Sequence, residues 1–131
     1  MTVHVVAAIV QHENKFLCVQ RGPHSFGYIS YKYEFPGGKV EPNETEELAL
    51  VRELKEELSL DITVKEHFMT VSYKYPDFDL KMECFICHTN QPKIILTEHI
   101  AYTWLPTNKL LSLDWAPADI PIAQRLVEED L

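Results

Sequence analysis

The segment between residues 43 and 58 limits the architectures open to this chain, because it has the period of a helix with two chemically different faces. At about 100° per residue, its apolar side chains fall within one arc of roughly 100°. These side chains are Leu50, Val51, Leu54 and Leu58. Three carboxylates, Glu53, Glu56 and Glu57, fall within a separate arc. We therefore expect a helix that packs on a sheet through one face and presents carboxylates on another.

The residues around this segment predict where the helix begins and ends. Asn43 follows Pro42 and can accept a hydrogen bond from the first turn, and Glu46, three residues on, completes a capping-box pattern. The helix is expected to end at about Leu58.

Extended segments surround the helix. The apolar, β-branched run over residues 3–10 predicts a buried strand, and a turn at Glu13-Asn14 leads into a second strand over residues 15–20. Further strands are expected at residues 33–35, 63–75, 79–88 and 97–105, with a loop over 21–30, a sharp turn at 36–38 and a final helix after residue 121. This order predicts one α/β (α+β) domain over residues 1–131, with strands and helices packed in layers.

The formal net charge of −8 narrows the partners. A nucleic-acid polymer requires a basic surface, so we expect none, whereas a polyphosphate that arrives with divalent cations remains compatible. No apolar run approaches the roughly 20 residues of a membrane helix, and the first six residues lack the basic stretch of a signal peptide. We expect a cytoplasmic protein without membrane contact, either a monomer or a dimer.

The three cysteines, Cys18, Cys84 and Cys87, suggest reduced thiols rather than a disulfide framework. Cys84 and Cys87 form a C-x-x-C pattern, but they lie in a predicted strand, where residues three apart point to opposite faces. The sequence has no second Cys or His pair at zinc spacing. Packing in the core is therefore favoured over metal binding or redox chemistry.

The three helical carboxylates have a spacing of i, i+3 and i+4, which makes the side chains neighbours. Like charges this close destabilise an isolated helix by a few tenths of a kcal/mol per pair. Magnesium prefers such oxygen ligands and shares its shell with water and phosphates. A solvated, charged helix face is the alternative interpretation.

The sequence around this helix resembles the Nudix box, a loop–helix–loop signature of 23 residues that would run here from Gly38 to Leu60. The matching positions are Gly38, Glu44, Arg52, Glu53, Leu54, Glu56, Glu57 and Leu60. Ser59 departs from the pattern, because the family usually has a glycine there to turn the chain out of the helix. We expect Ser59 to change the helix exit without abolishing activity.

The resemblance extends to most of the chain. Residues 33–39 are similar to the segment that precedes the box in MutT-like nucleotide pyrophosphohydrolases. Glu98-His99, with Trp104 downstream, is similar to the segment that brings a further glutamate to the metals, and residues 116–121 are similar to a segment with a base-reading Asn or Asp. The resemblance implies a Nudix fold, a mixed β-sheet sandwiched between helices.

The resemblance also implies a site for Mg²⁺, with Mn²⁺ as the alternative. Its expected ligands are the Gly37 carbonyl and the carboxylates of Glu53, Glu56, Glu57 and Glu98. Arg52 would hold a glutamate by a charge-assisted hydrogen bond, unless it forms an ordinary helix ion pair. Glu44 is off the carboxylate arc and is expected to support the loop. Either Glu53 or Glu98 would accept the proton of the attacking water.

The expected substrate contacts lie outside the carboxylate arc. Arg21 and Lys39 are candidates to bind the outer phosphates, with plain surface cations as the alternative. The base is expected near Phe35, Phe78 and Asp119, because an aromatic ring can stack on it and a carboxylate accepts hydrogen bonds from guanine or cytosine. The alternatives are a core position for Phe35 and a helix cap for Asp119.

The activity implied is metal-dependent hydrolysis of a nucleoside triphosphate, by attack at the β-phosphorus, to a nucleoside monophosphate and pyrophosphate. Two substrate groups compete within it, 8-oxo-dGTP in nucleotide-pool sanitation and DNA repair, and CTP or 5-methyl-dCTP. Asp119 slightly favours the second group. Two other hypotheses are a Nudix hydrolase of a dinucleoside polyphosphate or nucleotide sugar, and a non-catalytic nucleotide-sensing module. The retained Glu53, Glu56 and Glu57 disfavour the sensing module.

Overall fold

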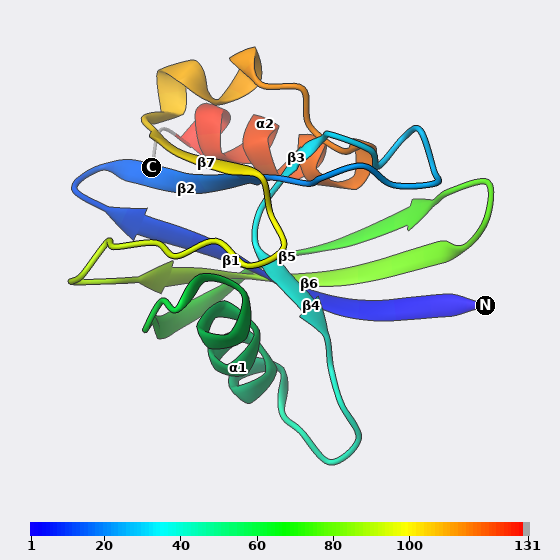
Figure 1. Cartoon of the computed structure of the whole chain (residues 1–131), viewed down its shortest axis with the longest axis horizontal. Coiled ribbons are helices and arrows are strands. Elements are labelled where there is room, and N and C mark those ends of the chain that lie inside the picture. The colour runs from blue at the N-terminus through cyan, green and yellow to red at the C-terminus, as the bar shows by residue number, and fades with distance from the viewer. Residues whose placement is uncertain (130–131) are drawn as a thin grey trace.

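The computed structural model, which describes residues 1–129, places one helix on each face of a central sheet (Figure 1). Helix α1 (Glu46–Leu58) covers one face, and helix α2 (Ile120–Glu129) covers the other. The predicted fold class, a mixed sheet between helices, is confirmed. Within residues 1–129, no helix has the length and apolar character that crossing a membrane requires.

The sheet mixes parallel and antiparallel pairs. Its strands are β1 (Thr2–His12), β2 (Lys15–Gln20), β3 (Tyr33–Glu34), β4 (Gly37–Lys39), β5 (Thr63–Lys74), β6 (Asp79–His88) and β7 (Ala101–Leu105). The order is β3-β2-β1-β6-β5, with β4 paired to β1 and β7 paired to β2. β1 and β6 run parallel, and the other pairs are antiparallel. Two short 3₁₀ helices, η1 (Thr107–Ser112) and η2 (Pro117–Asp119), lead into α2.

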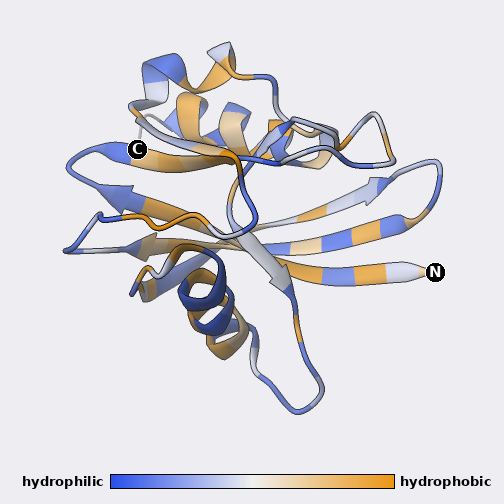
Figure 2. Ribbon diagram, in the orientation of Figure 1, coloured by the Kyte–Doolittle hydropathy of each residue, from blue (hydrophilic) through white to orange (hydrophobic). Residues whose placement is uncertain are grey.

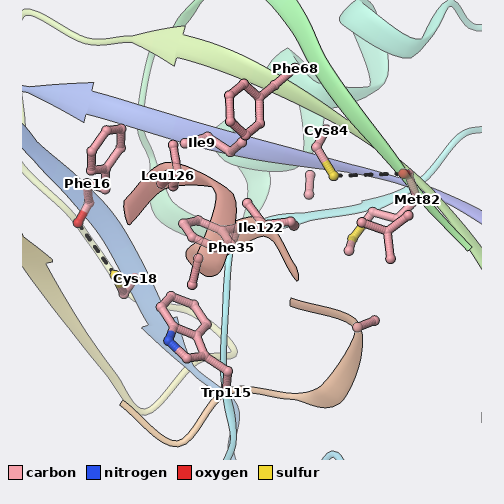
Figure 3. Packing of buried hydrophobic residues seen from close by; sticks show 14 of the residues in the cluster. Ile9, Phe16, Cys18, Phe35, Phe68, Met82, Cys84, Trp115, Ile122 and Leu126 are labelled. Atoms are coloured by element: carbon pink, nitrogen blue, oxygen red, sulfur yellow. Dashed lines mark hydrogen bonds between the residues drawn. The ribbon is translucent and has the colours of Figure 1, made fainter. Parts of the chain in front are cut away.

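β1 supplies side chains to two separate cores, because successive residues of a strand point to opposite faces. Ala7 and Ile9 belong to the core under α2, whereas Val6, Ala8 and Val10 belong to the core under α1. The alternation of hydrophobic and hydrophilic residues is visible along β6 in Figure 2. Figure 3 shows the core under α2, where Ile122 and Leu126 lie among aromatic rings.

The cysteines pack in these cores, as predicted. Cys18 and Cys84 lie in the core under α2, and Cys87 lies in the core under α1, so the two residues of the C-x-x-C pattern do point to opposite faces. All three are free and buried. Burial raises the pKa of Cys18 and of Cys87 to about 12, which keeps both groups as unreactive thiols.

The start of α1 differs from the prediction. Thr45 caps the helix, and its hydroxyl accepts a hydrogen bond from the backbone N–H of Leu48 at 3.2 Å. Asn43 lies in the preceding turn with a φ of 65°, so the predicted capping box of Asn43 and Glu46 is wrong. The physical reason is that the Glu44 side chain accepts a hydrogen bond from the Glu41 N–H and so closes the preceding turn, which moves the N-cap two residues along the chain.

The buried stripe of α1 also differs by one residue. Leu50, Leu54 and Leu58 are fully buried, but Val51 is 40% exposed and Ala49 takes its place against the sheet. The helix is rotated relative to the predicted arc, so that small Ala49 joins the core under α1 and Val51 faces solvent.

Residues 36–38 were expected to form a sharp turn, but Gly37–Lys39 is a strand that pairs with Val5–Ala7 of β1. A Cβ atom added to Gly37 would lie 1.9 Å from the Val6 carbonyl oxygen. The glycine therefore serves a close backbone approach rather than a turn.

The strand expected over residues 97–105 begins at Ala101. Thr97 bonds instead to α1, because both its N–H and its hydroxyl donate to the Glu57 carbonyl.

Ser59 ends α1 in the left-handed conformation, with φ 52° and ψ 35°. Its N–H donates to the Lys55 carbonyl at 3.1 Å, which satisfies one of the carbonyls left free at the helix end. The expectation of a changed helix exit is therefore wrong, because the serine adopts the conformation that a glycine would supply.

Candidate active site

Arg52 joins the carboxylate face of α1 to the loop that precedes the helix. Its Nε and Nη2 donate to the two carboxylate oxygens of Glu44 at 2.7 and 2.9 Å, a paired geometry that only the planar guanidinium can make. These bonds lower the pKa of Glu44 to about 2. Nη2 also donates to the Lys39 carbonyl at 3.1 Å, and Nη1 donates to Glu53 at 2.9 Å. Arg52 thus orients one carboxylate of the predicted site and anchors the loop.

Gly38 provides the space in which the Glu53 carboxylate lies. A Cβ atom at position 38 would lie 2.4 Å from the Glu53 carboxyl carbon, so any larger residue would push this carboxylate out of its place. The Glu53 side chain is 14% exposed and receives the hydrogen bond from Arg52. Strand β4 and helix α1 therefore approach each other closely at the point where the carboxylates gather.

Glu57 lies deeper, one helical turn along the same face. Burial, together with the charges of Glu53, Glu34 and Glu98, raises its pKa to about 8. Its Oε2 atom is buried and has no hydrogen-bond partner among the described residues. An unpaired buried carboxylate oxygen beside other carboxylates is costly in the bare protein, and a divalent cation would satisfy it. The donor set, made of hard oxygens, fits magnesium or manganese.

The remaining predicted ligands are more open. Glu56 is exposed and lies 3.4 Å from Arg52 Nη1, and Glu98 is exposed on the segment before β7. Gly37 lies beside Gly38 in β4 and lines the neighbouring cavity. The structure therefore brings Glu53 and Glu98 close enough to Glu57 for their charges to act on it, and leaves Glu56 exposed to solvent.

Another group of potential metal ligands lies at the beginning of α1. Among residues 1–129, the ligand atoms of His4, Glu46 and Glu83 lie within 4.8 Å of one another. These side chains already have partners, since His4 contacts Glu46 at 2.8 Å and Glu83 binds His67 at 2.8 Å. Ion pairing on the sheet surface accounts for this group.

A cavity of about 140 Å³ opens beside the carboxylates. Glu34, Gly37, Gly38, Phe78 and Asp119 are among the residues that line it. Mostly apolar walls with a few polar groups are typical of a site that binds a small, flat molecule.

Asp119 is the most buried carboxyl group of the cavity, at 5% exposure. Its Oδ1 accepts a hydrogen bond from the Phe35 N–H at 3.0 Å, and η2 places it just before α2. Burial raises its pKa well above the usual range, and the charge of Glu34 adds to the effect. The side chain thus binds the backbone after β3, and its second oxygen is free of the Phe35 hydrogen bond.

The two predicted aromatic contacts differ in position. Phe35 is 3% exposed and stacks on Trp115, with ring centroids 4.7 Å apart, so its ring is part of the core (Figure 3). Phe78 is half-buried at the cavity, next to Tyr75 at 5.2 Å. Phe78 is therefore better placed than Phe35 to offer a ring face to a ligand.

The two predicted cations lie in different surroundings. Arg21 is 3.5 Å from Glu34 and lines a second cavity, of about 240 Å³, with Glu98 and His99. Lys39 has an exposed side chain, and its carbonyl binds Arg52.

Three side chains at this site were missed in the sequence. Glu34 lines the first cavity, and His99 Nε2 lies 3.0 Å from its Oε2. Tyr75 accepts a hydrogen bond from the Ala118 N–H at 3.0 Å and so holds the segment before Asp119. A charged Glu34 between Tyr33 and Phe35 was a usable signal, because a carboxylate in an apolar strand requires a partner. The Tyr75 contact spans 43 positions and leaves no local pattern.

Known proteins resemble this chain over nearly its whole length. The family description of the NUDIX domain matches residues 1–126. The CTP pyrophosphohydrolase of Escherichia coli (strain K12) is 34% identical over 93% of this chain and 89% of that protein. The 8-oxo-dGTP diphosphatase of Proteus vulgaris is 39% identical over 64% of this chain and 74% of that protein.

Solved structures agree with this relationship. The solution structure of the E. coli ORF135 protein superposes with a TM-score of 0.81 at 33% identity, over 97% of this chain and 89% of that one. The MutT protein from methicillin-resistant Staphylococcus aureus 252 superposes with a TM-score of 0.75 at 39% identity, over 98% of both chains. The chain therefore belongs to the Nudix family and is a MutT-like hydrolase.

Proposed function

We propose that this protein hydrolyses a nucleoside triphosphate to a nucleoside monophosphate and pyrophosphate, with Mg²⁺ as its metal and Mn²⁺ as a substitute. The observation that carries the proposal is the buried oxygen of Glu57, which has no hydrogen-bond partner in the described part of the chain and lies among three further carboxylates, next to a mostly apolar cavity. The first feature suits cations and phosphates, and the second suits a base. A nucleotide is a molecule that joins these two chemistries.

Gly37, Glu53, Glu56, Glu57 and Glu98 are the groups proposed to hold the metal. When bound, a divalent ion neutralises phosphate charge and helps to organise a water for attack on phosphorus. Arg52 keeps Glu53 in place through its hydrogen bond at 2.9 Å, and Gly38 keeps space for it. Removing either support displaces a carboxylate without changing the number of charges at the ligands.

Glu98 is the better candidate to accept the proton of the attacking water. Glu53 is held by Arg52 and is packed against Gly38, whereas Glu98 is exposed at the cavity that it shares with Arg21. A general base must reach the water and then release its proton to solvent, which an exposed carboxylate does readily. Arg21 is proposed to meet the outer phosphates from the same cavity, and Lys39 from the loop before α1.

For the base, we propose cytosine ahead of oxidised guanine. Over nearly the whole chain, the relative named for CTP is 34% identical, whereas the E. coli relative named for 8-oxo-dGTP is 27% identical. Asp119 is the proposed contact to the base edge, with Phe78 against the ring. Because burial favours the neutral carboxyl, its free oxygen can donate as well as accept, which matches the adjacent N3 acceptor and N4 donor of cytosine.

The test is a substrate panel with the purified protein. Canonical, 5-methyl-cytosine and 8-oxo-guanine nucleoside triphosphates are compared with a dinucleoside polyphosphate and a nucleotide sugar, with and without Mg²⁺. We expect pyrophosphate release from a cytosine nucleotide, and label from isotopic water in the pyrophosphate. Release of orthophosphate would contradict the proposal. So would a protein that turns over only the dinucleoside polyphosphate or only the nucleotide sugar.

A further inference from the structure

Glu34 lies near two parts of the site, the cavity that contains Asp119 and the carboxylates around Glu57. It lines the same cavity as Asp119 and Gly38. Its charge contributes to the raised pKa of Asp119 and to the raised pKa of Glu57. A single side chain therefore lies near both the expected base contact and the expected metal ligands.

His99 forms a hydrogen bond with this carboxylate. Its Nε2 atom lies 3.0 Å from Glu34 Oε2, and its side chain is 5% exposed. Because a carboxylate can only accept, Nε2 carries the hydrogen. The Nδ1 atom is buried without a hydrogen-bond partner among the described residues, so Glu34 is the one hydrogen-bond partner that the ring has there. The other Glu34 oxygen, Oε1, lies 3.5 Å from Arg21.

In a nucleotide, the sugar is the part that joins base to phosphates. Sugar hydroxyls are donors, and a fixed carboxylate is the group that proteins commonly place against them. We propose that Glu34 binds a hydroxyl of the nucleotide sugar, and that His99 is the positioning residue that holds Glu34 for this contact. The inference rests on the proposed function and adds a contact to the sugar to those already proposed for the base and the phosphates.

The two roles predict different mutational patterns. Glu34→Ala removes the acceptor and so affects substrates that carry the hydroxyl. His99→Leu leaves the acceptor in place but lets it turn away, and His99→Gln supplies an N–H at about the position of Nε2. The matched control is His67→Leu, because His67 forms a similar 2.8 Å contact with Glu83 on the surface of the sheet under α1.

The experiment compares the ribonucleoside, 2′-deoxy and 2′,3′-dideoxy triphosphates of one base. It measures kcat/KM, and the Kd of the α,β-methylene analogues in Mg²⁺. We expect the wild type and His67→Leu to favour one hydroxyl by about ten- to a hundredfold, the range of a hydrogen bond to a charged group. Glu34→Ala should abolish this ratio, His99→Leu should reduce it, and His99→Gln should restore most of it.

Two results would overturn the assignment. One is a wild type that binds and turns over all three sugars alike. The other is an equal loss for all three sugars in Glu34→Ala together with a higher Mg²⁺ requirement, which would make Glu34 a metal ligand. Failure of the proposed function is distinguishable from both, because a wild type that releases no pyrophosphate can still be scored by the Kd ratio of the analogues.

Discussion

At the scale of the residue, Glu57 shows how burial and neighbouring charges set the state of one carboxyl group. Arg52 gives two hydrogen bonds to Glu44, one to Glu53 and a longer one to Glu56, but within residues 1–129 no hydrogen bond reaches Glu57 Oε2. Glu53 and Glu57 of the same helix are therefore in different environments. Glu53 is paired with the Arg52 guanidinium, whereas Oε2 of Glu57 has no such partner among the described residues. The proposed metal would supply the partner that this oxygen lacks.

We expect Glu57→Gln to lower kcat by at least about a hundredfold while the protein stays folded, because it removes a charge that holds the metal. Glu47→Gln, on the exposed first turn of α1, is the matched control and should keep normal rates. Steady-state kinetics across a Mg²⁺ titration provides the measurement. Wild-type turnover of Glu57→Gln at saturating Mg²⁺ would refute the metal assignment.

The raised pKa of Glu57, about 8, also predicts the pH dependence of stability without metal. A carboxyl whose folded pKa lies above its unfolded value favours the folded state most at low pH, and this contribution disappears as the pH rises from about 4.5 toward 8. In EDTA, the wild type should therefore lose stability relative to Glu57→Gln over this range. Urea unfolding at pH 5 and pH 8 measures the difference, and added Mg²⁺ should stabilise the wild type at pH 8. A constant difference between the two proteins would contradict the linkage.

Asp119 is a second residue whose carboxyl group has a raised pKa. If it contacts the base, Asp119→Ala should shrink the discrimination between cytosine and guanine nucleotides by roughly ten- to a hundredfold. Asp119→Asn keeps the acceptor for the Phe35 N–H and tests the base contact separately. The ratio of kcat/KM for the two nucleotides, beside a thermal melt, is the measurement. A lowered Tm with an unchanged ratio would leave Asp119 with a structural role alone.

At the scale of the element, the end of α1 determines how the segment with Glu98 meets the carboxylates of the helix. The Ile95 N–H bonds to the Leu58 carbonyl at 2.9 Å, and the Thr97 N–H bonds to the Glu57 carbonyl at 3.2 Å. Carbonyls at a helix end lack partners within the helix, and here the segment before β7 supplies them. The same contact brings Glu98, the next residue, toward the carboxylates of α1.

Ser59 allows a direct test of this helix end. Its left-handed conformation costs a non-glycine residue about 1 kcal/mol, so Ser59→Gly should raise stability by somewhat less than that, since glycine also gains freedom when unfolded. The expected rise in Tm is about 2–5 °C. Differential scanning calorimetry measures it, with Ser59→Ala as the control that should not stabilise. A fall in Tm for the glycine variant would show that the serine hydroxyl has a contact of its own.

At the scale of the whole molecule, the base side of the site is assembled from elements that are distant in the chain. Tyr75 follows β5, is 6% exposed, and stacks on Tyr28 of the loop after β2 with ring centroids 4.8 Å apart. Its hydroxyl accepts from the Ala118 N–H at 3.0 Å. One side chain therefore connects a loop, a hairpin and the segment that carries Asp119.

Tyr75→Phe removes this connection and keeps the ring. The buried Ala118 N–H would lose its partner, at a cost of about 1–3 kcal/mol in the free energy of unfolding. We also expect a weaker preference between bases, with the rate on the preferred nucleotide less affected. Urea denaturation and the kcat/KM ratio give the two readouts, and Tyr73→Phe, at an exposed neighbouring position, is the control. Unchanged stability would mean that Ala118 N–H finds another partner.

What the sequence determined by itself was local. The helical period placed Glu53 and Glu57 on one face and Leu50, Leu54 and Leu58 on another, and strand alternation separated Cys84 from Cys87. These patterns are readable because the geometry of a helix or strand repeats over a few residues. The match to the box around this helix likewise rests on fixed local spacing.

The tertiary structure decided the contacts between distant residues. The pairing of Gly37 with β1 and the hydrogen bond of His99 to Glu34, 65 positions apart, depend on which elements pack together. The burial of Asp119 and the partner of Tyr75 depend on the same packing. A carboxylate or a hydroxyl has the same formula wherever it lies in the chain. Its pKa and its partner come from the groups that folding brings within a few ångströms, and no local period records them.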